Sequence, residues 1–251
     1  MLLEVEETRV ILDSTVFSKC KPFIVVGIPA FNEEKTISRV VFAAQKFADV
    51  VMVCDDGSSD QTATVAMSLG ADVIKHKHNL GYGAAIRSLF KRARELNAAI
   101  LVTIDSDGQH DPNEIPNVVK PIVQGMADMV IGSRFINNAY GTAEMPMYRR
   151  FGAKLITKLV NGSSKNGVRD SQSGFRAYNR QALERLNISE AGMGVSVEIL
   201  FKASKHNLKI CEVPSSCKYH NGNVANSTKN PITHGLSVII SIIRLMVKRL
   251  C

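Results

Sequence analysis

Two aspartates stand two positions apart where a long apolar run ends: Asp105 and Asp107 follow AAILVTI in the motif DSDGQHD. Alternate side chains of an extended chain point the same way, so these carboxylates should face one side of a strand tip. Such a pair repels itself unless a cation lies between the groups, and oxygen ligands suit Mg²⁺ or Mn²⁺. Gln109 adds a neutral oxygen at the next alternate position. The competing interpretation is a polar turn, in which Asp111 caps the following helix.

A second acidic motif, DDGSSD, follows the apolar run at 50–54. Ser58 and Gln61 fit a capping box for the next helix, which explains these two residues. It does not explain Asp55 and Asp56 together. A carboxylate can accept hydrogen bonds from a nucleobase N–H or a ribose hydroxyl, so the two aspartates are candidates for a nucleoside site.

The motif IPAFNEE at 28–34 has two interpretations. Asn32 could cap a helix, and Glu33 beside the helix N-terminus is electrostatically favourable. Pro29 and Phe31 could instead line one side of a base pocket. The sequence alone leaves both open.

The glycines of HNLGYGAAI begin a GxGxxG count at Gly81 and Gly83, but the last position is Ile86. The dinucleotide fingerprint therefore fails, and a tight turn into a helix is expected. Arg134 and Arg176 are candidates for binding an anion, since arginine matches phosphate geometry. Arg134 is favoured because it directly follows a predicted strand.

Short apolar runs alternate with amphipathic segments from residue 23 onward, which predicts an α/β fold with a parallel sheet. The predicted strands lie at 23–28, 50–54, 72–76, 98–104, 128–133 and 208–214. The predicted helices lie at 33–47, 59–69, 83–97, 113–125, 147–161, 179–187 and 193–206. Residues 170–178 read as a loop and a short strand. The polar motifs follow the strands, at the sheet edge where ligands bind in open α/β folds.

The chain has 251 residues, a net charge of +8 and a sequence pI of about 9.3. This balance suits phosphorylated ligands or an anionic membrane. The basic residues are scattered without zinc-finger spacing or an RNP motif, so no nucleic-acid partner is expected. Five cysteines without CxxC spacing indicate neither a disulfide framework nor a zinc site, and they fit a reducing cytoplasm.

The segment 234–250 predicts a helix with a narrow polar stripe and a wide apolar face. Its stripe consists of Ser237, Ser241, Arg244 and Lys248. Such a helix could pack on the core of its own domain, or it could lie in the headgroup region of an anionic membrane. The pattern does not separate the two.

Taken together and in this order, IPAFNEE, DDGSSD, DSDGQHD, GSRF, DSQSGFRAY and EVP resemble family 2 glycosyltransferases. The likeness is to the branch that contains dolichol-phosphate mannose synthases and polyprenyl-phosphate hexosyltransferases. It implies a GT-A fold and inverting transfer of a hexose from a nucleotide-sugar, GDP-mannose ahead of UDP-glucose, to a polyprenyl phosphate. We accordingly expect an N-terminal extension at 1–22, a GT-A domain at 23–230 and a C-terminal amphipathic helix at 231–251, which could associate with a membrane.

The resemblance also assigns roles by motif position. Asp105, Asp107 and Arg134 would take part in catalysis, and the cofactor would be Mg²⁺ or Mn²⁺. The nucleotide-sugar would contact Pro29, Phe31, Glu33, Asp55, Asp56 and Asp105. The metal would be bound by Asp105, Asp107 and Gln109. The acceptor phosphate would be bound by Arg134, Arg149 and His220. Phe31 departs from the usual tyrosine, and CKYHNGNVANS after EVP lacks the usual arginine, so Lys218 is an alternative to His220.

The implied partners are the donor, the lipid acceptor and the cytoplasmic face of a membrane, where the enzyme would be peripheral and a membrane partner protein could join it. A polysaccharide or other non-lipid acceptor is the alternative, and Glu198 is the candidate base for that reaction. A sugar-phosphate nucleotidylyltransferase would need a Gly-rich basic loop after the first strand, which IPAFNEE is not. A non-catalytic nucleotide-binding module would not need the set Asp105, Asp107 and Gln109.

Overall fold

The computed structural model describes residues 21–136, 157 and 167–217. Its strands are β1 (Ile24–Ala30), β2 (Val50–Asp55), β3 (Asp72–Lys75), β4 (Ile100–Thr103), β5 (Met129–Ser133), β6 (Arg176–Asn179) and β7 (Ile210–Pro214). Its helices are α1 (Ile37–Ala44), α2 (Thr62–Ser68), α3 (Tyr82–Glu95), the short 3₁₀ helix η1 (Pro112–Glu114), α4 (Ile115–Val123), α6 (Arg180–Arg185) and α7 (Val195–Lys205). The predictions for Arg149, His220, the helix at 147–161 and the termini lie outside these residues.

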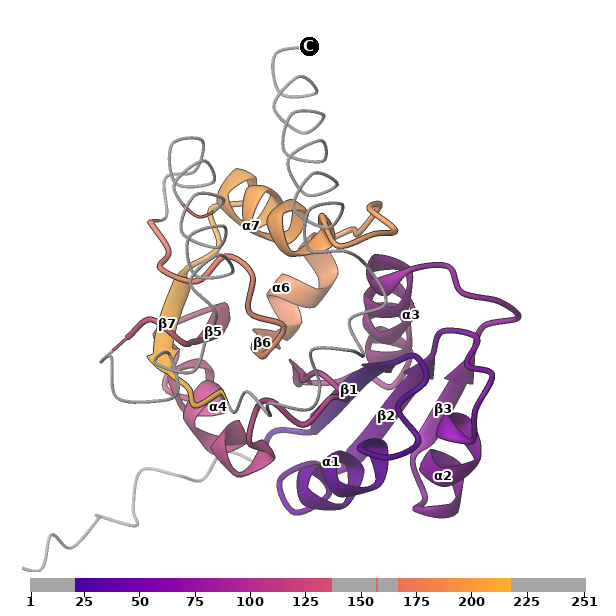
Figure 1. Ribbon diagram of the computed structural model, residues 1–251. Coiled ribbons are helices and arrows are strands. Elements are labelled where there is room, and N and C mark those ends of the chain that lie inside the picture. Colours follow the sequence, from indigo (N-terminus) through magenta and orange to yellow (C-terminus); the bar gives the residue numbers. More distant parts are fainter. Residues whose placement is uncertain (1–20, 137–156, 158–166, 218–251) are drawn as a thin grey trace, which may run out of the picture.

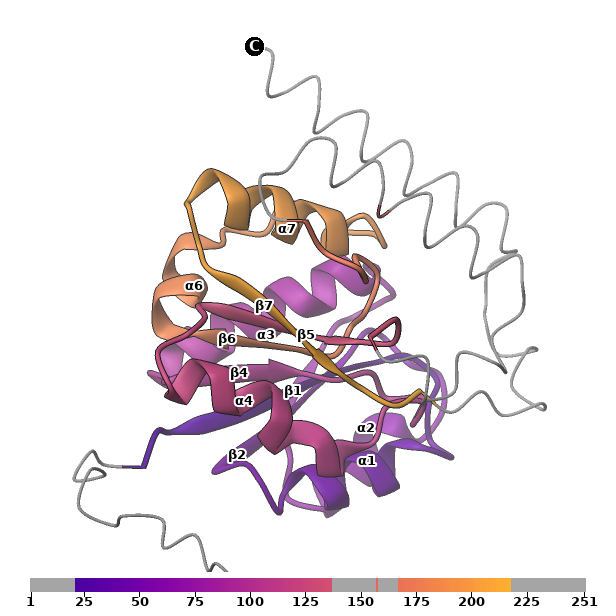
Figure 2. The same ribbon diagram turned by 90° about the vertical axis from the view of Figure 1, so that its left-hand side faces the viewer.

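The seven strands form one sheet that is covered by helices on both faces (Figures 1 and 2). Helices α1, α2 and α4 cover one face, and α3, α6 and α7 cover the other. All of β1 is buried, because a strand covered on both faces has no solvent side. The apolar runs in the sequence therefore predicted these strands correctly.

The strand order is β3-β2-β1-β4-β6-β5-β7, and β6 alone runs antiparallel to its neighbours. Thr103 of β4 pairs with Arg176 of β6, and β5 pairs in parallel with β7. The prediction of a mostly parallel sheet with flanking helices is confirmed. The antiparallel strand comes from 170–178, where the strand-helix alternation of the N-terminal half has ended.

The chain adds its first strands on one side of β1 and its later strands on the other side. Strands β2 and β3 lie on one side of β1, whereas β4 lies on the other. Loops leaving β1 and β4 therefore diverge and leave a crevice at the carboxyl ends of these strands, where open α/β sheets bind ligands. IPAFNEE and DSDGQHD both begin at this point.

The predicted caps differ from the observed ones. Asn32 has φ 56° and caps no helix; its Oδ1 accepts a hydrogen bond from the Ser59 N–H at 2.9 Å. The Ser58 hydroxyl accepts from the Asn32 N–H, so it is not available for a capping box. These loop-to-loop bonds tie IPAFNEE to DDGSSD, which local patterns could not reveal. The prediction for Asp111 is confirmed, since its carboxylate caps η1 through the Asn113 N–H.

Within the described part of the chain, no helix is both long enough and apolar enough to cross a bilayer. The segment 234–250, for which a membrane-surface helix was an expectation, lies outside that part.

Candidate active site

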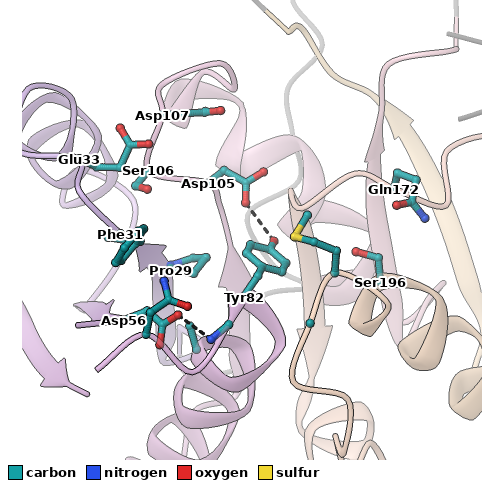
Figure 3. Close-up of a pocket in the computed structure, with 16 residues that line it drawn as sticks. Pro29, Phe31, Glu33, Asp56, Tyr82, Asp105, Ser106, Asp107, Gln172 and Ser196 are labelled. Atoms are coloured by element: carbon teal, nitrogen blue, oxygen red, sulfur yellow. Dashed lines mark hydrogen bonds between the residues drawn. The ribbon is translucent and has the colours of Figure 1, made fainter. Parts of the chain in front are cut away.

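A cavity of about 360 Å³ lies at the carboxyl ends of β1 and β4 (Figure 3). Six chain segments contribute to its wall, and they come from both halves of the described chain. The lining residues are Pro29, Ala30, Phe31, Glu33, Asp56, Asn79, Gly81, Tyr82, Ala85, Asp105, Ser106, Asp107, Gln172, Gly192, Met193 and Ser196. Six of the residues expected from the sequence are therefore gathered around one space: Pro29, Phe31, Glu33, Asp56, Asp105 and Asp107.

Three carboxylates border one side of the cavity. Asp105 and Asp107 follow β4, Glu33 follows β1, and Figure 3 shows Glu33 and Asp107 on the same side. Burial, together with repulsion from Asp105 and Glu33, raises the pKa of Asp107 to about 7. Burial and the neighbouring Asp60 and Asp105 likewise raise the pKa of Glu33. Among the described residues, negative charge thus exceeds positive charge on this side of the cavity, which fits a site for a divalent cation.

The two predicted carboxylate ligands, Asp105 and Asp107, would not complete the coordination shell of a metal ion. Among the described residues, no group of three or more His, Cys, Asp or Glu side chains is arranged to hold a metal by itself. This arrangement suits Mg²⁺ or Mn²⁺, which keep open positions for water and substrate phosphates. Gln109 does not line the cavity: its N–H donates to Asp107 Oδ1 at 2.9 Å, and its Oε1 is 3.7 Å from the Cys217 thiol. Direct ligation by Gln109 stays a prediction.

The two aspartates of DDGSSD differ in their surroundings. Asp56 lines the cavity and its Oδ1 lies 2.7 Å from His76 Nδ1, while its two oxygens also accept the backbone N–H groups of Leu80 and Gly81. Asp55 is fully buried and accepts the Ser58 N–H, and it does not line the cavity. Asp56 therefore fixes the loop before α3, and a contact of either aspartate with a nucleoside stays a prediction.

The wall opposite the β4 carboxylates comes from Gln172 and the segment 192–196 (Figure 3). Glu198 holds this segment in place, because its buried carboxylate accepts the N–H groups of Ser189 and Glu190, the Ser189 hydroxyl, and the Lys202 ammonium. Burial raises the pKa of Glu198, but these bonds outweigh it and bring the pKa below its ordinary value. All these partners make Glu198 a structural anchor, so the structure does not support it as a base.

The glycines of LGYG lie against this same segment. A Cβ atom at Gly83 would come closer than 3.0 Å to the carbonyl oxygens of Glu190 and Gly192. Gly81 has φ 101° and begins α3, so the predicted tight turn into a helix is confirmed. The absence of side chains at both positions lets the 190–192 segment approach the start of α3 and close the cavity.

Arg134 does not line the cavity, and it forms a two-pronged ion pair with the buried Asp170. Its Nε and Nη2 lie 2.7 and 2.8 Å from the two carboxylate oxygens. Glu212, in EVP, accepts the N–H groups of Arg169 and Asp170 and so fixes the aspartate. The positive charge nevertheless reaches the site, since it lowers the pKa of Asp107 against the larger effects that raise it. A phosphate contact by Arg134 stays a prediction.

Arg176 is buried, contrary to the expectation that it could bind an anion. Its guanidinium donates to the carbonyl oxygens of Ser196 and Ser171 at 3.2 and 2.8 Å. It therefore joins two segments behind the cavity wall. The sequence pattern could not show this, because the arginine's partners are backbone groups of distant residues.

Several cavity residues were not expected from the sequence. Tyr82 was within a motif that read only as a turn, yet its hydroxyl donates to Asp105 Oδ1 at 3.0 Å. The polar cluster after the third strand was the available signal for it. Met193 and Ser196 carry no such signal, because an ordinary loop and helix bring them to the cavity.

The sequence of residues 25–186 matches the model of the family described as Glycosyl transferase family 2. A UDP-N-acetylglucosamine--dolichyl-phosphate N-acetylglucosaminyltransferase of Methanococcus voltae is 36% identical over 224 residues, which cover 80% of this chain and 88% of that one. A polyprenol monophosphomannose synthase of Mycolicibacterium smegmatis is 30% identical over 204 residues, 75% of each chain.

Among solved structures, glucosyl-3-phosphoglycerate synthase of Mycobacterium tuberculosis in complex with UDP superposes with a TM-score of 0.70 at 22% identity. The match covers 89% of this chain and 80% of that chain. A second crystal structure of that synthase contains Mn²⁺, UDP and phosphoglyceric acid. These similarities confirm the GT-A-like fold, and the family match extends over both acidic motifs that border the cavity. The chain belongs to glycosyl transferase family 2 and is a glycosyltransferase.

Proposed function

We propose that this chain transfers a sugar from a nucleotide-sugar to a polyprenyl phosphate in a metal-dependent, inverting reaction. The observation that carries the proposal is the carboxylate pair Asp105 and Asp107 on the wall of a cavity at the switch point of the sheet. A cavity of about 360 Å³ is within the usual range for small-ligand sites. Its position and its charge suit the diphosphate end of such a donor.

Asp105 and Asp107 would hold Mg²⁺ or Mn²⁺, which would neutralise the charge that grows on the departing nucleoside diphosphate. The half-buried position of both carboxylates strengthens this electrostatic effect relative to bulk water. Arg134 supplies a positive charge close enough to act on Asp107. We therefore keep Asp105, Asp107 and Arg134 as the residues proposed to serve catalysis.

The nucleoside end of the donor would lie against Pro29 and Phe31, which line the cavity on the β1 side. Figure 3 shows Asp56 on that side also, away from Glu33 and Asp107. The name of one relative contains UDP-N-acetylglucosamine, and the name of the other contains monophosphomannose. GDP-mannose and UDP-sugars are thus the donors to compare.

A lipid phosphate acceptor would not require a general base. A phosphate monoester is mostly ionised near neutral pH, since its second pKa is about 6, and so needs little proton removal. Glu198, the carboxylate expected for a hydroxyl acceptor, is bound by its own neighbours. The names of both relatives refer to polyprenyl or dolichyl phosphate, which supports the same acceptor class.

The rest of the proposal concerns the acceptor phosphate and the membrane. Arg134, Arg149 and His220 would bind the phosphate, with the Arg134 guanidinium oriented by Asp170. The segment 231–251 would hold the enzyme at the cytoplasmic face of the membrane, where its lipid acceptor lies. Liposome flotation of the full chain and of a chain ending at residue 230 tests that role: equal binding by both would exclude it.

A donor panel tests the reaction itself. The full chain is incubated with Mn²⁺ and a short polyprenyl phosphate together with GDP-mannose, UDP-glucose or UDP-N-acetylglucosamine, and products are identified by mass. One of these donors should give a glycosyl polyprenyl phosphate, and EDTA or Asp107→Ala should abolish it. Glu184→Gln, an exposed charge change, is the matched control and should keep full activity. Transfer to a soluble glycan but not to the lipid phosphate would replace this proposal by the polysaccharide alternative.

A further inference from the structure

The Asp105 carboxylate is held by two chain segments other than its own. The Tyr82 hydroxyl, from the first turn of α3, donates to Asp105 Oδ1 at 3.0 Å. Figure 3 shows this contact, with Tyr82 pointing from the nucleoside side of the cavity toward the β4 tip. Among the described residues, Oδ2 has no hydrogen-bond partner. One oxygen is thus fixed by a phenol and the other is left for a ligand.

Gly174, from SGFRAY, closes in on the same carboxylate from another direction. A Cβ atom at this position would lie 2.5 Å from both Asp105 oxygens, far closer than real Cβ contacts. The Gly174 carbonyl is itself fixed, because it accepts the Thr103 hydroxyl of β4 at 2.8 Å. The glycine therefore sets a boundary that keeps Asp105 within reach of Tyr82.

The ring of Tyr82 is positioned before any ligand binds. Asp56 accepts the N–H groups of Leu80 and Gly81 at 2.9 and 2.8 Å, which fixes the turn that begins α3. The phenol hydroxyl is the donor in its contact with Asp105, because an ionised carboxylate oxygen can only accept.

We propose that Tyr82 is a positioning residue of the metal site, which orients the Asp105 carboxylate through its hydroxyl while Gly174 limits the carboxylate's movement. The inference rests on the proposed metal-dependent function. It assigns a role in the metal site to Tyr82, a residue outside the motif DSDGQHD. Partners that orient a ligand commonly change metal affinity by about 10-fold or more when they are removed. Tyr82 touches neither the reacting atoms nor the metal in this scheme; it acts through Asp105.

The test is Mn²⁺ binding to the full chain in the presence of UDP or, in a parallel arm, GDP, followed by electron paramagnetic resonance. Tyr82→Phe should weaken Mn²⁺ binding by about 10-fold, since it removes the hydroxyl and keeps the ring. Ser68→Ala, which removes an exposed hydroxyl of α2 outside the cavity, is the control and should bind Mn²⁺ like the wild type. Thermal unfolding of each variant confirms that it is folded.

A double-mutant cycle separates positioning from a general structural effect. In the Asp105→Asn background, Tyr82→Phe should cause no further loss of Mn²⁺ binding, because the interaction it serves is already gone. Gly174→Ala, which keeps the phenol but displaces the carboxylate, should also weaken Mn²⁺ binding. Unchanged affinity in Tyr82→Phe, or additive losses in the cycle, would overturn the inference alone. A wild type that binds no Mn²⁺ with either nucleotide would overturn the proposed function as well.

Discussion

Asparagine in place of Asp107 should make the metal-free protein more stable and its metal complex weaker. The substitution removes a negative charge that burial and the Asp105 and Glu33 carboxylates disfavour. It keeps an oxygen that can accept the Gln109 N–H, which donates to Asp107 Oδ1 at 2.9 Å in the wild type. The variant therefore isolates the charge from the local hydrogen bonding.

The size of the effect follows from the pKa of Asp107, which rises from the ordinary 3.8 to about 7. At about pH 8 the carboxylate is ionised in both the folded and the unfolded chain, so the whole shift acts against the folded state. This rise in the pKa corresponds to a free energy of about 4 kcal/mol, and solvent at this half-buried group reduces the expected gain in stability to about 1–2 kcal/mol. For a chain of this length, such a gain raises the midpoint of thermal unfolding by about 2–8 °C.

The assay compares thermal unfolding of wild type, Asp107→Asn and Glu184→Gln at about pH 8, first in EDTA and then with Mn²⁺ and UDP or GDP. In EDTA, Asp107→Asn should unfold at the highest temperature. With metal and nucleotide at about 100 times their dissociation constant, the wild type should gain about 2.7 kcal/mol and the variant little. The stability order of the two proteins should then be reversed.

A lower midpoint for Asp107→Asn in EDTA would show that the carboxylate makes favourable contacts, and the charge argument would be wrong. An equal gain of both proteins from metal and nucleotide would show that Asp107 does not serve the cation.

Three further variants test the supports of the cavity. Glu198→Gln should lower the free energy of unfolding by about 2 kcal/mol at neutral pH, by urea titration. Burial raises the pKa of Glu198, but bonds from Lys202 and Ser189 bring it below its ordinary 4.5. The loss of unfolding free energy in the variant should therefore persist above that pH and shrink below it. A difference in unfolding free energy that does not change with pH would contradict this. Gly83→Ala should cost about 1–3 kcal/mol by crowding the 190–192 carbonyls, whereas Gly167→Ala, whose added Cβ would meet no atom of the described residues within 4 Å, should be nearly neutral. Asp170→Asn should cost about 3 kcal/mol in urea unfolding, because it removes the buried negative charge that pairs with the Arg134 guanidinium; a change below about 1 kcal/mol would argue against this ion pair.

The strands and most helices of the N-terminal half were predictable, because strands that are buried on both faces consist mainly of apolar residues. The run AAILVTI contains β4, and the carboxylates after it line the cavity as their spacing implied. Position at the end of a buried strand was enough to place Asp105 and Asp107, since parallel strands end at a common edge.

Side-chain partners were not predictable in the same way. Arg176 and Glu198 looked like groups that could meet a substrate, yet both bind backbone groups of the wall behind the cavity. The difference depends on which distant segment packs against each residue. Local residue type and spacing contain no information about that packing.

The relation between Tyr82 and Asp105 shows what the fold adds to the motifs. The two residues are 23 positions apart, and helix α3 and strand β4 must pack together before the hydroxyl meets the carboxylate. Carboxylates with raised pKa values, such as those of Asp107 and Glu33, are unfavourable for folding, so the surrounding structure must hold them at a cost in stability. Here the support comes from Gly174, Asp56 and the start of α3, none of which needs to contact the metal. The acidic motif supplies the carboxylates, while these distant residues determine how the Asp105 carboxylate is oriented.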